Sequence, residues 1–260
     1  MNYKRFKVKA KYKETNRLRT KFFDDKNEEN LRVRLKNMGY VEPILITELD
    51  HESPTEAQVN YAKKLKITIP KYATKEDLRC LLSRAIDKDT IPNKELIEFA
   101  DEKNIFFSEY IGKKALYNLI YHKLTEEDRI AFFIFCVYRH LSNDRRGNLL
   151  KHPHQSKFYE IAQKAQASEK VKKSILRYRG EDLRFFGTMI SSNRLAIDGG
   201  SVNTYGYKFV SEILSSEFNL RKTRTLNYSQ ISSRHEGKGN SCLSVISILL
   251  ALMLWAFMII

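Results

Sequence analysis

The side chains best suited to hold a metal ion are Cys136, His140, His152 and His154. Cys136 and His140 are four residues apart, so a helix would place them on one face. Zinc accepts thiolate and imidazole ligands, but this spacing matches no closed zinc motif. Cys136 also lies in a strongly apolar stretch, which favours a buried thiol. We therefore predict no metal site and no cofactor.

Acidic residues and nucleophiles give no clearer indication of catalysis. Carboxylates are paired at Asp87/Asp89 and Glu181/Asp182 and run together at residues 126–128. Adjacent positions do not show that two carboxylates converge on a substrate. The chain has no P-loop, GxGxxG or HExxH motif, and no local motif of a nucleophile with its base. We therefore favour a non-enzymatic function, with an enzyme of unrecognised site as the alternative.

Basic charge indicates the class of partner. The 260 residues include 46 Lys and Arg against 31 Asp and Glu, for a net charge of +15, which favours nucleic acid, anionic lipid or an acidic protein. Basic residues concentrate in residues 1–40, 141–180 and 221–240. The candidate contacts with nucleic acid or an acidic partner are Lys63, Lys64, Lys66, Lys71, Arg145, Arg146, Lys172 and Lys173. A solvated helix face is the alternative interpretation of each group.

Residues 241–260 (SCLSVISILLALMLWAFMII) contain no charge, Pro or Gly. A helix of about 20 residues is roughly 30 Å long, the thickness of a bilayer's hydrocarbon core. The preceding segment is basic, and its cations are Arg221, Lys222, Arg224, Arg234 and Lys238. By the positive-inside rule these membrane-flanking residues keep the rest of the chain in the cytoplasm. The sequence thus predicts a tail-anchored, single-pass membrane protein, with a buried core helix as the alternative.

Three segments precede this apolar run. In residues 1–50, Phe6, Val8 and Ala10 alternate with cations as in a strand with one basic and one apolar face. A second strand near residues 18–23, a helix capped by Asp24 or Asp25, and a third strand around residues 44–46 complete a small ββαβ unit.

Residues 51–90 predict a helix, an extended stretch and a second helix. Ser53 with Glu56 forms a capping box for the first helix, and Thr74 caps the second. Ile69 precedes Pro70 and is therefore extended. This order over residues 53–88 resembles SAP-like, or helix-extension-helix, modules. The resemblance implies a compact module of a kind that often binds DNA, with lysines facing the phosphates.

Residues 91–218 predict a mainly helical domain. Asn93 opens one helix, Ser108 caps the next, and Thr125 caps a third in which residues 130–138 are apolar on every side, as in the centre of a core. Gly187 and Gly199 bracket a less regular section, and residues 219–240 form a basic linker. The fold class expected is α+β with a C-terminal transmembrane helix.

Two functions remain open from the sequence. The first is a membrane-anchored protein that presents a basic interaction domain to an acidic protein or anionic lipid. The second is a membrane-tethered nucleic-acid-binding protein that uses the 53–88 module and the basic clusters.

Overall fold

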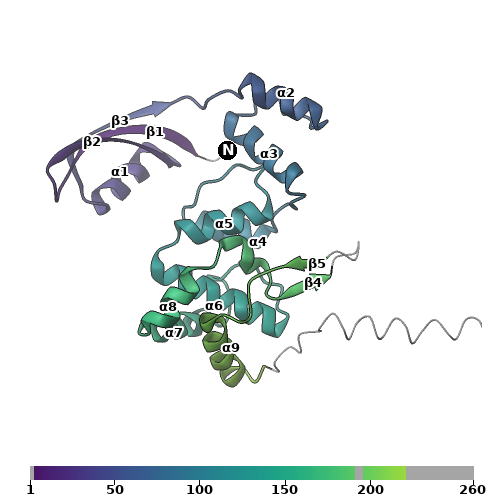
Figure 1. Ribbon diagram of the computed structural model, residues 1–260. Helices are drawn as coiled ribbons and strands as arrows, with labels where there is room; N and C mark the ends of the chain where they lie inside the picture. Colours follow the sequence, from purple (N-terminus) through teal and green to yellow (C-terminus); the bar gives the residue numbers. More distant parts are fainter. Residues whose placement is uncertain (1–2, 191–195, 221–260) are drawn as a thin grey trace, which may run out of the picture. The chain divides into compact units, whose positions relative to one another are not determined.

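The computed structural model describes residues 3–190 and 196–220, and Met1–Leu220 forms one compact unit. Its first elements are β1 (Lys4–Tyr12), β2 (Arg17–Asp25), α1 (Glu28–Asn37) and β3 (Tyr40–Leu49). The strands form an antiparallel sheet in the order β2-β1-β3, and α1 covers one of its faces (Figure 1). The predicted ββαβ order is confirmed.

The alternation of side chains along β1 decides which face α1 covers. Phe6, Val8 and Ala10 point toward the helix and are buried with Leu31 and Leu35 of α1. Successive side chains of a strand point to opposite faces of the sheet, so the residues between them point away from α1. The sheet therefore has one covered apolar face and one uncovered face.

Helix α1 begins later than the sequence predicts. Its N-cap is Asn27, whose side-chain oxygen accepts a hydrogen bond from the backbone N–H of Asn30 at 2.8 Å. The prediction of Asp24 or Asp25 as the cap is wrong, because both residues still belong to β2 and Asp25 lies opposite Lys4 of β1. The strand holds their backbone extended, too far from the helix to cap it.

The next elements are α2 (Glu56–Lys64) and α3 (Lys75–Ile86), joined by a segment without regular structure. Thr74 caps α3, as predicted. Helix α2 starts with Thr55 as its N-cap and Gln58 completing the box, so the predicted pairing of Ser53 with Glu56 is wrong. Thr55 is extended and its hydroxyl accepts the N–H of Gln58 at 3.2 Å, which moves the start of the helix two residues along the chain.

The remaining described elements are mainly helices: α4 (Lys94–Glu102), α5 (Lys113–Lys123), α6 (Glu126–Ser142), α7 (Gln155–Gln166), α8 (Glu169–Leu176), the 3-10 helix η1 (Gly180–Arg184), β4 (Thr188–Ile190), β5 (Ala196–Asp198) and α9 (Tyr205–Glu217). Strands β4 and β5 pair antiparallel within the section predicted to be irregular. The fold is a mixture of α and β, as expected.

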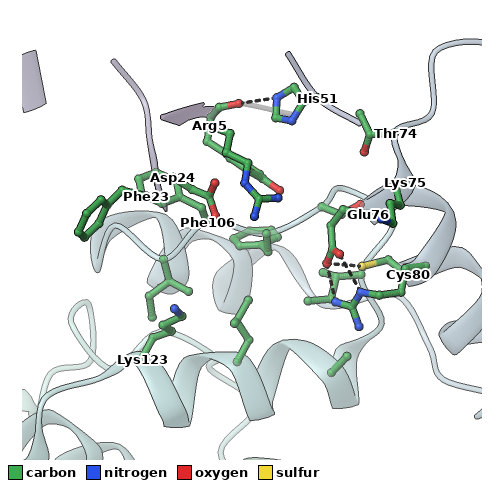
Figure 2. Close-up of a pocket in the computed structure, with 18 of the residues that line it drawn as sticks. Arg5, Phe23, Asp24, His51, Thr74, Lys75, Glu76, Cys80, Phe106 and Lys123 are labelled. Atoms are coloured by element: carbon green, nitrogen blue, oxygen red, sulfur yellow. Dashed lines mark hydrogen bonds and ion pairs between the residues drawn. The ribbon is translucent and has the colours of Figure 1, made fainter. Parts of the chain in front are cut away.

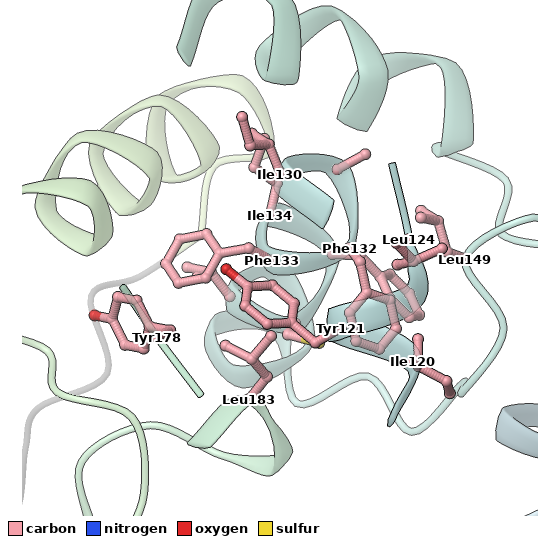
Figure 3. Close-up of a cluster of buried hydrophobic side chains, with 14 of the residues drawn as sticks. Ile120, Tyr121, Leu124, Ile130, Phe132, Phe133, Ile134, Leu149, Tyr178 and Leu183 are labelled. Carbon is pink, nitrogen blue, oxygen red and sulfur yellow. The ribbon is translucent and has the colours of Figure 1, made fainter. Parts of the chain in front are cut away.

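Helix α6 is the centre of the largest core, and Figure 3 shows the side chains packed around it. All residues from 130 to 138 are buried, which confirms the predicted helix covered on every side. Phe132 stacks on Phe99 of α4 at 5.2 Å between ring centroids, and Phe133 lies 4.8 Å from the ring of Tyr178. A helical stretch that is apolar on every face is stable only when other elements surround it.

Ser108 does not cap α5, contrary to the prediction. The N-cap is Gly112, which has no side chain to offer, and the carboxylate of Asp89 accepts the N–H of Lys114 at 2.8 Å instead. Ser108 is buried and donates its hydroxyl to Asp77 of α3 at 2.6 Å. The carboxylate of Asp89, which is distant in sequence, thus accepts a hydrogen bond from a backbone N–H that has no partner within α5.

Each of the three segments has its own cluster of buried apolar residues: one under the sheet, one between α2 and α3, and one around α6. Tyr110 packs against the second and third clusters. Within residues 3–190 and 196–220, no helix is both long and apolar enough to cross a membrane. The predicted transmembrane helix at residues 241–260 lies outside the described residues.

Candidate polyanion-binding surface

The uncovered face of the N-terminal sheet carries a row of cations along its central strand. Arg5, Lys7, Lys9 and Lys11 of β1 are all exposed and alternate with the buried side chains. Residues two apart on a strand are about 6.8 Å apart. The basic strand face predicted from the sequence is therefore present, and we call these four residues the basic row.

Apolar side chains flank the basic row on both neighbouring strands. The pairing places Leu18 opposite Lys11, Phe22 opposite Lys7 and Leu45 opposite Lys9. Residues opposite each other on paired strands lie on the same face of the sheet. Leu18, Phe22 and Leu45 are 56%, 57% and 60% exposed. We call the surface formed by these three residues and the basic row the open face.

Few carboxylates compensate the charge of the open face. No residue of the basic row forms an ion pair within residues 3–190 and 196–220, whereas Lys4, on the opposite face, bonds Glu48 at 2.9 Å. The one acidic residue on the open face is Asp24, opposite Arg5 at one end. The guanidinium of Arg5 lies over the ring of Phe22 at 5.8 Å from its centroid. The surface is therefore positive and partly apolar.

The lysines of the helix-extension-helix segment are also exposed. Lys63 and Lys64 end α2, while Lys66 and Lys71 lie in the segment before α3, and none of the four has an ion pair in the part of the chain that the structure describes. Lys71 lies over the ring of Tyr72, which is 83% exposed. The sequence pattern did not indicate this aromatic residue as a contact.

The basic residues predicted as contacts in the helical domain are less available to a partner. Arg146 bonds Asp144 at 2.8 Å, and Lys172 bonds both Glu126 and Glu169. Arg145 and Lys173 are exposed and make no ion pair with any described residue. Because half of this group already has carboxylate partners, it offers less free charge than the open face. The membrane-flanking residues Arg221, Lys222, Arg224, Arg234 and Lys238 lie outside the described residues.

A cavity of about 1300 Å³ lies beside one end of the open face, and Arg5, Phe22 and Asp24 belong to its lining. Figure 2 shows Glu76 and Cys80 on one side of it and Phe106 at its centre. The thiol of Cys80 donates to Glu76 at 3.6 Å. Burial, with the nearby charge of Glu76, raises the pKa of Cys80 to about 12, so the thiol stays protonated at neutral pH and is a poor nucleophile.

The residues considered for metal binding have other partners. His152 is buried and its Nε2 lies 3.1 Å from the carboxylate of Asp144, while His140 lies against the rings of Phe186 and Tyr207. Among the residues that the structure describes, no three His, Cys, Asp or Glu side chains gather as metal ligands would. These histidines therefore have packing and hydrogen-bonding roles.

The acidic pairs also act structurally. Asp128 bonds Lys103 at 2.7 Å and accepts the hydroxyl of Tyr159 at 2.6 Å. Asp182 and Glu181 both bond Arg179. In the described structure these carboxylates therefore hold neighbouring elements together.

No known family, curated protein or solved structure matches this chain. The resemblance of residues 53–88 to SAP-like modules therefore depends on the order of the two helices and the segment between them.

Proposed function

We propose that this chain is a non-enzymatic, membrane-attached protein that binds an acidic partner through the open face of its N-terminal sheet. One observation carries the binding part of the proposal: four cations stand in a row without carboxylate partners among the described residues. Exposed charges of one sign raise the local concentration of an oppositely charged partner and speed its association. The apolar run at residues 241–260, with its basic flank, supports attachment to a membrane.

The pairing of several charged groups in the cavity lining favours a non-catalytic role for those groups. The Cys80 thiol is protonated at neutral pH, and Glu76 and Arg79 bond each other at 2.7 Å. Lys75, also in the lining, bonds Glu52 at 2.7 Å. A general acid or base must be free to exchange a proton with its substrate, and Glu76 and Lys75 are each held by a charged partner.

Retention on immobilised heparin, a soluble polyanion, tests the open face. The full chain in mild detergent should elute at lower salt when Lys7, Lys9 and Lys11 are replaced by Gln. A matched control replaces Lys63, Lys64 and Lys71 by Gln, which removes the same charge from another exposed surface. Surface charges are screened by salt, so the elution position reports their contribution. Equal elution of the two variants would contradict the assignment to the open face.

Fractionation tests the attachment. The full chain should stay with membranes after washing at high salt and enter the soluble fraction only with detergent. Replacing Leu250 and Leu254 by Arg places two charges in the apolar run, each costing about 3 kcal/mol at the centre of a bilayer. That variant should be released without detergent, and a native chain released by salt alone would refute attachment through this segment.

A nucleic-acid-binding function is the second candidate. It is favoured by the free lysines of the helix-extension-helix segment beside the exposed ring of Tyr72. Cations that follow a phosphate backbone, with an aromatic ring for stacking, suit this ligand. In this case, replacing Lys63, Lys64 and Lys71 by Gln should weaken binding to single- and double-stranded oligonucleotides more than replacing Lys7, Lys9 and Lys11 does. The binding that remains in the Lys63, Lys64 and Lys71 variant should also depend less on salt.

A further inference from the structure

We infer that the open face docks on the surface of an anionic lipid bilayer, with the basic row against the headgroups and Leu18, Phe22 and Leu45 in the interfacial layer. This inference rests on the proposed function, because it names the partner of the same surface. It goes beyond a general affinity for acidic molecules, since it assigns a role to the apolar side chains as well as to the cations.

The arrangement of the open face first excludes a second copy of this chain as the occupant. Two open faces in contact would bring two uncompensated basic rows together, because the one carboxylate on each face is Asp24 at the end beside Arg5. Like charges placed directly opposite each other destabilise a sheet surface or an interface. The occupant must carry negative charge.

The apolar side chains on both sides of the basic row favour lipid over a nucleic acid as the occupant. A single-stranded nucleic acid stacks its bases on aromatic rings, and the open face presents one ring, Phe22, among aliphatic side chains. Leucines give a base nothing to stack on, whereas Leu and Phe are the side chains that enter the boundary between headgroups and acyl chains. The aliphatic flanks on both sides of the basic row thus match a surface that is anionic outside and apolar below.

The geometry of the sheet allows both contacts at once. Lys7 and Lys9 stand on the same face as Phe22 and Leu45, each directly opposite one of them. Lysine keeps its ammonium group in water or headgroups while its aliphatic stem lies along apolar surface. Under the proposed function, the apolar run at residues 241–260 attaches the same chain to a bilayer.

Lysine acetylation measured by mass spectrometry tests this inference on the full chain. The probes are vesicles of phosphatidylcholine alone and of a three-to-one mixture with phosphatidylglycerol. Acetylation of Lys7, Lys9 and Lys11 should slow roughly tenfold on the mixed vesicles relative to the neutral ones, and high salt should restore it. Lys63 and Lys64 on α2 serve as internal references whose acetylation should not change.

A pair of variants separates docking on lipid from a simple affinity for polyanions. Replacing Leu18 and Leu45 by Ser keeps every charge and should abolish most of the protection on mixed vesicles, while retention on heparin stays unchanged. The matched control replaces Ile86 and Ile91, which are 54% and 71% exposed on other parts of the chain, and should keep full protection. Circular dichroism checks that both variants are folded.

Each outcome decides a separate question. Unprotected lysines on mixed vesicles, or protection that survives the Leu18 and Leu45 substitutions, would overturn the inference. Protection by an added single-stranded oligonucleotide but not by mixed vesicles would overturn it in favour of nucleic acid. Flotation with neutral vesicles reports attachment through residues 241–260 independently. If the chain floats with neutral vesicles but its lysines are not protected on mixed vesicles, only this inference fails. If the lysines are protected but the chain does not float with neutral vesicles, only the proposed attachment fails.

Discussion

Replacing Ser108 by Ala should destabilise the protein by an amount that can be worked out from its contacts. The Ser108 hydroxyl is buried, donates to the Asp77 carboxylate at 2.6 Å and accepts the N–H of Tyr110 at 3.1 Å. Asp77 lies in α3 and Ser108 in the loop before α5, so the bond joins the helix-extension-helix segment to the helical domain.

A hydrogen bond to a charged group contributes about 1.5–3 kcal/mol, and the alanine also leaves the Tyr110 N–H without this partner. The carboxylate keeps the bonds of its other oxygen to the backbone N–H and the hydroxyl of Thr74, at 3.0 and 2.9 Å. Because those bonds still stabilise the charge, we expect a loss near the middle of the range, about 2 kcal/mol in the free energy of unfolding.

Urea denaturation of the full chain in mild detergent, followed by circular dichroism, measures this loss. The matched control is Ser83→Ala, which removes an exposed hydroxyl bond to Asp87 at 3.1 Å and should cost less than about 0.5 kcal/mol. An unchanged m-value would show that the compactness of the unfolded state is the same in both variants.

A double-mutant cycle with Asp77→Asn isolates the bond itself, since two residues in direct contact should not behave additively. A cost below about 0.5 kcal/mol for Ser108→Ala, or fully additive effects with Asp77→Asn, would refute the assignment of this bond.

Gly180, the two buried cysteines and His152 each allow a further test. A Cβ at Gly180 would lie 2.4 Å from the backbone oxygen of Tyr117, so Gly180→Ala should cost about 2 kcal/mol and lower Tm by roughly 4–8 °C in a thermal melt; an unchanged Tm would contradict that close approach. Burial raises the pKa of both Cys80 and Cys136 to about 12, so neither thiol should react with iodoacetamide at about pH 8 until the chain is denatured; peptide mapping that finds early labelling would show that the thiol is accessible. Burial lowers the pKa of His152 more than its bond to Asp144 raises it, so below about pH 6.5 the unfolded chain binds more protons than the folded one. The free energy of unfolding should therefore fall as the pH drops from about 7 to 5, and the fall should be smaller in His152→Gln; identical profiles would exclude this histidine as a cause.

Local pattern predicted much of the secondary structure because short-range physics determines it. The alternation in β1 and the apolar run at residues 130–138 each require burial of a particular kind, and the structure shows both. The caps at Thr74 and Thr125 were predictable because each hydroxyl bonds a backbone N–H three residues later. The caps at Asp24, Asp25 and Ser108 were predicted wrongly because strand pairing or a distant partner holds those residues. Ser53 was predicted wrongly because Thr55 caps α2 instead.

The candidate binding surface, too, could be predicted from the sequence only in part. Composition and residue pattern were enough to predict that the chain is strongly basic, that β1 has a basic face, and that residues 241–260 are long and apolar enough for a membrane span. They could not tell which cations stay free, since ion pairs such as that of Lys172 with Glu126 join residues far apart in the chain.

The side chains beside the basic row could be identified only from the pairing of the strands. Leu18, Phe22 and Leu45 belong to the open face because the register of the strands places them opposite Lys11, Lys7 and Lys9. A shift of one residue in that register would turn each strand's side chains to the other face. Register depends on burial of the opposite face against α1, a long-range contact, and that is why the sequence predicted a basic strand while the structure revealed an amphipathic surface.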